Sequence, residues 1–285
     1  MAMSFHEGNR TNRRKRLRLA GWCISVLGLL TGVFAATPVR VEPERPVVDL
    51  ELILAVDVSS SMSEAEQRVQ RDGYVSAFRH PGVARAIGLG PRGMIAVAYI
   101  EWAGPSYQRI VLPWTIIASS DEAKRFADAL AVQPIAGEAG TSISGGLLQA
   151  EDLFTHSRSK GQRRVIDVSG DGPNNAGPSV TPVRDKLVAF GISINGLPIS
   201  LHSRNSSAFK SFSKSYLESY FERCVIGGPD AFTIGIDDIS QFEVAVRRKL
   251  VREIAGLPAR AWLASYQPRS SSVVDCLAIG QVPGR

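Results

Sequence analysis

Residues 57–61 of the chain read Asp-Val-Ser-Ser-Ser, which places one carboxylate and two hydroxyls at alternate positions. Oxygen ligands of this kind suit hard divalent cations, and Mg²⁺ takes about six of them in an octahedral arrangement. One short segment does not complete that shell. Thr141, between Gly140 and Ser142, and Asp171 offer similar oxygens further along the chain. The candidate metal ligands are therefore Asp57, Ser59, Ser61, Thr141 and Asp171.

The elements around these residues predict that they meet. Leu50–Val56 is a near-continuous apolar run, typical of a strand buried on both faces, and it ends just before Asp57. A second strand is expected over residues 164–168, just before the segment that holds Asp171. Thr141 precedes a predicted helix at residues 143–154. Loops at the carboxyl ends of parallel strands share one edge of the sheet, so we expect one site there.

The remaining pattern alternates between strands and helices over about 210 residues. This alternation predicts an α/β fold, a single domain with a doubly wound, mostly parallel central sheet flanked by helices. Ser63 followed by Glu66 predicts a capping box at the start of the first helix. Further strands are expected at residues 94–102, 109–114, 192–199 and 231–236, and further helices at 63–79, 120–131, 180–189, 209–221 and 239–255.

The five oxygen-bearing residues, in this order and loop context, resemble the metal-ion-dependent adhesion site (MIDAS) of von Willebrand factor type A (VWA) domains. The resemblance covers roughly residues 47–256 and implies a VWA-like, Rossmann-like fold. It implies that the hydroxyls of Ser59, Ser61 and Thr141 coordinate the metal directly, while Asp57 and Asp171 bind it largely through water. An open coordination position would accept an Asp or Glu carboxylate from a partner protein. The hydroxyl-rich shell favours Mg²⁺, with Mn²⁺ or Ca²⁺ also compatible.

Four other segments resemble an uncharacterised branch of exported bacterial VWA-like proteins, from which no function can be transferred. These segments are residues 101–104, 167–175, 194–199 and 224–229.

The beginning of the chain indicates export. A basic cluster at residues 10–18 runs into the apolar stretch 19–36, which ends in small residues. Residues 1–36 therefore read as a signal peptide or an N-terminal membrane anchor, which places the folded part in the periplasm or outside the cell. Residues 37–46 read as a linker, 47–256 as the VWA-like domain and 257–285 as a C-terminal tail. Membrane contact is expected only through an uncleaved N-terminal segment.

The charge and the cysteine content limit the partners and the cellular compartment that are expected. The formal net charge of +6 comes mostly from residues 1–36, since the rest holds 27 basic and 26 acidic residues. A nucleic-acid partner is therefore not expected. Cys224 and Cys276 are the only cysteines after the export segment. An oxidising compartment would permit a disulfide between them, and two independent buried thiols are the alternative.

Three functions fit these residues. The leading hypothesis is a non-enzymatic module that binds a protein partner through the metal. A Mg²⁺-dependent phosphohydrolase also places Asp at the end of its first strand, but its aspartate dyad needs an acid at position 59, where Ser59 stands. A structural envelope protein whose metal only ties the loops together is the third. Asp167 could hold the metal ligands in place without binding the metal itself, or its carboxylate could be satisfied by local groups at the strand end.

Overall fold

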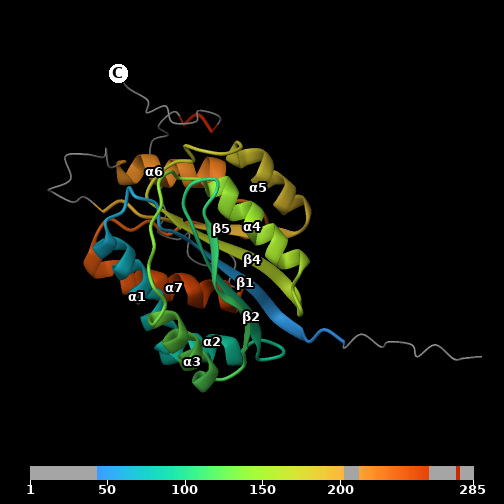
Figure 1. Cartoon of the computed structure of the whole chain (residues 1–285). Coiled ribbons are helices and arrows are strands. Elements are labelled where there is room, and N and C mark those ends of the chain that lie inside the picture. Colours follow the sequence, from blue (N-terminus) through green and yellow to red (C-terminus); the bar gives the residue numbers. More distant parts are fainter. Residues whose placement is uncertain (1–43, 202–211, 257–273, 277–285) are drawn as a thin grey trace, which may run out of the picture. The chain divides into compact units, whose positions relative to one another are not determined.

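The fold is known from a computed structural model that describes residues 44–201, 212–256 and 274–276. A five-stranded sheet lies at its centre (Figure 1). Its order is β3-β2-β1-β4-β5, and only the edge strand β3 runs antiparallel to its neighbour. The strands are β1 (Val47–Asp57), β2 (Ile95–Trp102), β3 (Gln108–Ile117), β4 (Lys160–Gly170) and β5 (Ile192–Pro198). The expected signal segment falls outside the described residues, as does most of the tail.

Helices cover both faces of the sheet (Figure 1). One layer holds α1 (Glu64–Arg79), α2 (Pro81–Gly88), α3 (Ser120–Ala131) and α7 (Phe242–Ala255). The other holds α4 (Ile143–Thr155), α5 (Val180–Ala189), α6 (Lys214–Tyr220) and the π-helical turn Phe221–Val225.

The central strand β1 divides the interior into two cores. Leu52 and Leu54 pack into the core beneath α1 and α7, and Ile53 and Ala55 into the core beneath α4 and α5. Successive side chains of a strand point to opposite faces, so the uninterrupted apolar run feeds both layers. The doubly wound α/β fold expected from the sequence is confirmed.

Local signals set several boundaries as expected. The Ser63 side chain accepts a hydrogen bond from the Glu66 N–H, and the Glu66 carboxylate accepts one from the Ser63 N–H, which forms the predicted capping box. Helices α3 and α5 coincide with their predicted ranges. The helix expected from residue 209 begins at Lys214, capped by Ser213, and residues 202–211 lie outside the described part.

Two elements differ from expectation. The strand predicted at residues 231–236 does not form; Thr233 and Ile236 make only isolated bridges to Gly196 and Ile199. Helix α2 was not expected, because its eight residues are too few for a clear helical period. Its start is nevertheless well specified, with Pro81 in the first turn and the His80 ring accepting from the Gly82 N–H.

Cys224 and Cys276 form a disulfide, with their Cα atoms 5.4 Å apart. Cys224 is fully buried in the core beneath α4 and α5. Of the two alternatives left open by the sequence, the structure shows the bonded pair. Among the helices of the described residues, none has the length and apolar character needed to span a bilayer.

Candidate metal centre

The loops after β1 and β4 lie side by side because these strands are direct neighbours in the sheet. Val56 is paired with Ser169, one residue before each strand ends. Across the gap between the loops, the Ser61 hydroxyl donates to Asp171 Oδ1 at 2.7 Å. The hydroxyls of Ser59 and Ser61 are 2.8 Å apart. Residues from two distant parts of the sequence thus form one polar cluster at the carboxyl edge.

Asp57 lies at the base of this cluster and is fully buried. Its Oδ1 accepts a hydrogen bond from the Ser59 N–H at 2.7 Å, whereas its Oδ2 is buried without a partner among the described residues. A Cβ added at Gly170 would lie only 3.1 Å from that Oδ2, so the absence of a side chain at Gly170 keeps this space open. An unpartnered buried carboxylate oxygen costs free energy unless a cation or water satisfies it.

The electrostatics of the two carboxylates favour a cation. Burial, and then the charge of Asp171, raises the pKa of Asp57 well above its usual value. Burial raises the pKa of Asp171 to about 6; the Ser61 hydrogen bond opposes this rise and the charge of Glu66 adds to it. Two such groups resist ionising together, and a divalent ion would relieve both penalties. The residues present therefore fit a divalent metal.

Thr141 reaches the site through a loop that is tied to the Asp171 loop. Its N–H donates to Asn175 Oδ1 at 2.9 Å, and its carbonyl accepts from the Asn175 N–H at 2.9 Å. Thr141 is 4% exposed. The structure thus brings all three predicted loops to one edge. The third loop is tied to the Asp171 loop at Asn175 and to the Asp57 loop at Glu138.

Asn174 holds the same loop in shape. Its Oδ1 accepts from the Ser144 N–H at the start of α4, and its side-chain amide donates to the carbonyls of Ala176 and Pro178. Sequence reasoning did not assign roles to Asn174 or Asn175. Their place in a Gly- and Pro-rich segment was the available signal, because Asn side chains bond to main-chain groups in such turns.

Two glutamines of α1 fix the first loop. Gln70 donates to the Asp57 carbonyl at 2.8 Å, and Gln67 donates to the carbonyls of Val58 and Ser59. Both side chains are buried. Sequence reasoning missed them because a glutamine on a helix gives no sign of which loop it faces.

Asp167 belongs to a different cluster. It lies 2.6 Å from Lys249 Nζ of α7, and Lys249 also pairs with Glu253, which accepts from Asn195. All four side chains are buried. Burial raises the pKa of Asp167. Burial of Glu253, and then the charge of Asp167, raises the pKa of Glu253 to about 7. Asp167 is therefore paired with Lys249 of the distant helix α7, and not with a group local to the strand end.

The donor set decides which metal chemistry suits the cluster. No group of three or more His, Cys, Asp or Glu side chains suited to a metal occurs in the described part of the chain. Two carboxylates and several hydroxyls remain, and Mg²⁺ tolerates such a set because it keeps some of its own water.

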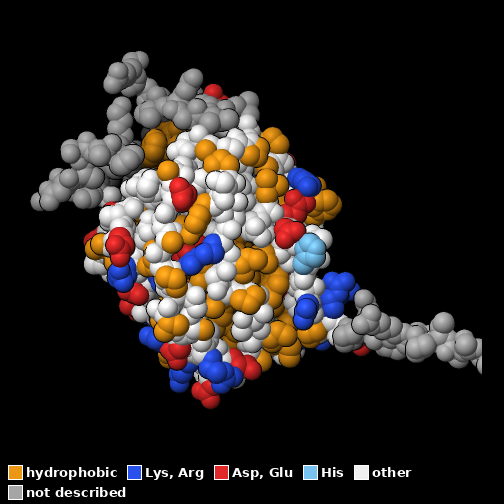
Figure 2. All heavy atoms as spheres, viewed as in Figure 1, with side chains coloured by type: hydrophobic (Ala, Val, Ile, Leu, Met, Phe, Trp, Pro, Cys, Tyr) orange, Lys and Arg blue, Asp and Glu red, His pale blue; other side chains and the backbone are white. Residues whose placement is uncertain are grey.

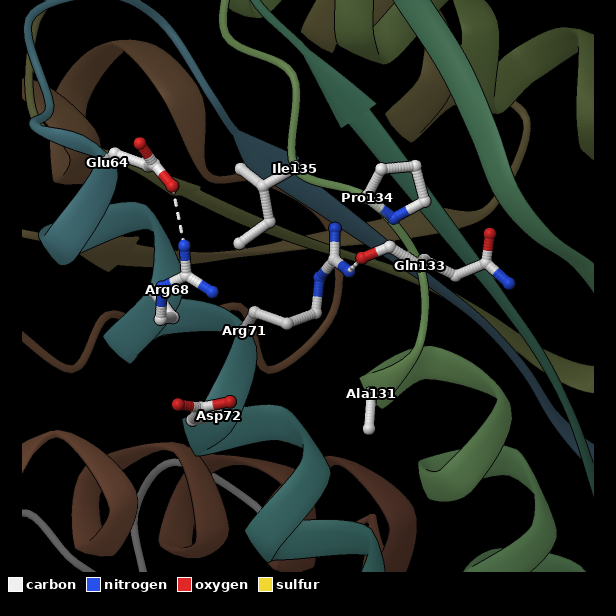
Figure 3. A pocket seen from close by; sticks show the side chains of 8 residues that line it. All are labelled: Glu64, Arg68, Arg71, Asp72, Ala131, Gln133, Pro134 and Ile135. Atoms are coloured by element: carbon white, nitrogen blue, oxygen red, sulfur yellow. Dashed lines mark hydrogen bonds and ion pairs between the residues drawn. The ribbon is translucent and has the colours of Figure 1, made fainter.

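A separate pocket of about 240 Å³ lies between α1 and the loop after α3 (Figure 3). Arg71 crosses its floor and donates to the Gln133 carbonyl, and its guanidinium also pairs with the buried Glu101. Arg68 pairs with Glu64 at the rim. Because Arg68 and Arg71 already have carboxylate partners, neither is a free cation for an anionic ligand.

The surface carries no broad basic face in the view of Figure 2, where Lys and Arg side chains are interspersed with Asp, Glu and apolar ones. This distribution agrees with the near-neutral charge of the sequence beyond residue 36. Nucleic-acid binding would favour a continuous basic surface.

Solved structures show the same fold. Proximal thread matrix protein 1 from the mussel byssus, with a zinc-occupied MIDAS motif, is 15% identical with a TM-score of 0.54, and the match covers 75% of this chain and 50% of that one. The pilus adhesin SpaC from Lactobacillus rhamnosus GG, in its open conformation, is 14% identical with a TM-score of 0.51, covering 73% and 30%. The chain thus spans half or less of these proteins. The VWA-like fold is confirmed.

Comparison with curated proteins gives no match. The family model described as "Protein of unknown function (DUF1194)" matches residues 47–258, which include every candidate metal ligand. The chain belongs to the DUF1194 family, with a VWA-like fold.

Proposed function

We propose that the chain is an exported, non-enzymatic module that binds a protein partner through a divalent metal held by Asp57, Ser59, Ser61, Thr141 and Asp171. The observation that carries this proposal is the buried, unpartnered Oδ2 of Asp57, beside a second carboxylate and the hydroxyls of two serines. Bound Mg²⁺ would supply a Lewis-acidic position for a partner's Asp or Glu carboxylate.

Residues of the chain prepare this position. Gln70 and Gln67 hold the Asp57 loop, and Asn175 holds the Thr141 loop against the Asp171 loop, so the donors are in place before a metal arrives. Such preorganisation lowers the entropic cost of binding. The names of the similar structures support adhesion as the class of function, since one is a pilus adhesin and the other a matrix protein with a metal-occupied MIDAS.

Export is part of the proposal. The Cys224–Cys276 disulfide supports it, because disulfides persist mainly in oxidising compartments. The rival phosphohydrolase finds no second acid beside Asp57 in its own loop, since Ser59 occupies the position that a general acid would need. A metal that only ties the loops together would affect stability without affecting partner binding.

The test is capture of partners from envelope extract by the immobilised full chain, with Mg²⁺ or with EDTA. Asp57→Asn removes one proposed metal-site group, and Asp128→Asn removes an exposed carboxylate of α3 that pairs with Arg79. We expect a protein that is captured by the wild type and by Asp128→Asn with Mg²⁺, and lost with EDTA or with Asp57→Asn. Capture that ignores both EDTA and Asp57→Asn contradicts the proposal.

A further inference from the structure

The carboxylates of Glu66 and Glu138 lie beside the proposed metal centre, and their negative charges are not offset there by an ion pair within the described residues. A divalent ion would offset the charges of Asp57 and Asp171, and the buried, unpartnered Oδ2 of Asp57 points to such an ion. Glu66 and Glu138 lie beside the same loops and add two more negative charges. Among the described residues of these loops, the charge with a divalent ion bound would therefore stay negative, which is unfavourable for a ligand that carries only a carboxylate.

Glu138 is fixed against the Asp57 loop by its main chain. Its carbonyl accepts from the Ser60 N–H at 2.9 Å, and its N–H donates to the Val58 carbonyl at 3.3 Å. The side chain is exposed, and its carboxylate accepts only from the adjacent Ala139 N–H among the described residues. This negative charge thus faces solvent directly beside the ligand-bearing loop.

Glu66 brings the second charge, from the first turn of α1. Its carboxylate accepts from the N–H and the hydroxyl of Ser63, both at 2.8 Å, so the capping box fixes its position. Ser63 lies two residues after Ser61 in the chain, so the capping box keeps the Glu66 carboxylate beside the segment that bears the candidate ligands. Within the described part of the chain, no Lys or Arg forms an ion pair with Glu66 or Glu138.

We infer that the partner presents its metal-binding carboxylate between Lys or Arg residues. The metal would take the carboxylate, and the flanking cations would meet Glu66 and Glu138. The same two charges would reject a ligand whose carboxylate lies among other acids, since like charges at close range oppose binding. This inference rests on the proposed metal-dependent function and adds the chemical class of the ligand.

Labelled peptides provide the test, with the full chain saturated with Mg²⁺ at low ionic strength and binding followed by fluorescence anisotropy. One peptide carries a central Asp between Lys residues, a second the same Asp between Glu residues, and a third Asn between Lys residues. We expect the first to bind about tenfold or more tighter than the second. Its binding should weaken with salt and vanish with EDTA, and the third should bind no better than the second.

Variants test whether Glu138 causes the preference for the peptide with flanking Lys residues. Glu138→Gln should reduce the preference between the first two peptides several-fold, and Glu138→Lys should abolish it. Asp128→Asn, which removes an exposed carboxylate elsewhere, should preserve it. Circular dichroism and Mn²⁺ affinity, measured on each variant, verify that the fold and the metal site persist.

The outcomes separate the two proposals. If the wild type binds neither Mn²⁺ nor Mg²⁺, the proposed function itself fails. If the metal binds but the peptides bind equally, prefer flanking Glu, or do not bind at all, the inference about the ligand is overturned and the metal site stands.

Discussion

The Ser61 hydroxyl donates a hydrogen bond to Asp171 Oδ1 at 2.7 Å, across a sequence separation of 110 residues. This bond joins the loop after β1 to the loop after β4. It holds the second carboxylate near the buried Asp57, and the repulsion between the two acids is then a property of the folded protein. A cation bound at this point would contribute to folding as well as to recognition.

In the Asp57→Asn variant, we expect the stability of the folded protein to no longer depend on the metal. The amide keeps an Oδ1 that accepts from the Ser59 N–H, and it removes the charge that burial and Asp171 penalise. Without metal, the variant should melt at or above the wild-type temperature. Mg²⁺ at 100 times its Kd should stabilise the wild type by about 2.7 kcal/mol, or roughly 5–10 °C in Tm. Differential scanning calorimetry should show no such rise in Asp57→Asn; an equal rise would place the metal elsewhere.

Much of this arrangement could be predicted from the sequence. The apolar run of β1 identifies a strand buried on both faces, and the Asp-Val-Ser-Ser-Ser segment follows its end directly. The strand expected at residues 231–236 was wrong: its alternation matches a strand, but the segment makes only isolated bridges, at Gly196 in β5 and at Ile199 just after β5. Periodicity does not report whether a neighbouring strand is available for pairing.

The supporting residues of the site were harder to predict. The roles of Gln67, Gln70 and Asn175 depend on bonds to main-chain groups of other segments, and no spacing rule connects them. Asp167 shows the same limit: its pairing with Lys249 joins β4 to a helix near the end of the domain. Alternation along β4 placed Asp167 on one face with Ser169 and Asp171 but did not reveal what lies opposite.

The buried cluster on α7 predicts a pH dependence of stability. The pKa of Glu253 is about 7 in the folded protein against 4.5 for an unperturbed glutamic acid, so folding favours its neutral form. Stability contributed by this protonation is present below about pH 4.5 and is lost as the pH rises through about 7. The groups that face Glu253 or respond to its charge are Asp167, Lys249, Asn195, Tyr74, Arg163 and Arg252.

The Glu253→Gln variant isolates the contribution of Glu253 to the pH dependence of stability. Its side-chain oxygen can still accept from Lys249 and Asn195, and it stays neutral at every pH. Urea unfolding of the Mg²⁺-saturated chain between pH 5 and pH 8 should show a larger loss of stability with rising pH in the wild type than in Glu253→Gln. Parallel pH profiles for the two proteins would refute the assignment.

Loss of the disulfide is expected to reduce stability without reducing metal affinity. The bond closes a loop between residues separated by 52 positions, for which the chain-entropy model gives up to about 4 kcal/mol. Cys276→Ser tests this without placing a hydroxyl at the fully buried Cys224 position. Chemical denaturation of the oxidised wild type, the reduced wild type and the variant measures the difference. Equal stability would show that the two sulfur atoms act independently in solution.

The most direct test of the metal centre is the Mn²⁺ affinity of the Ser60→Ala and Ser61→Ala variants, measured by isothermal titration calorimetry on the full chain. The Ser61 hydroxyl bonds to Ser59 and Asp171, whereas Ser60 is exposed and contacts Glu138 through a main-chain N–H that alanine keeps. Ser61→Ala should weaken Mn²⁺ binding by at least about tenfold, and Ser60→Ala should match the wild type. Equal Mn²⁺ affinity in both variants and the wild type would contradict a metal centre at this edge of the sheet.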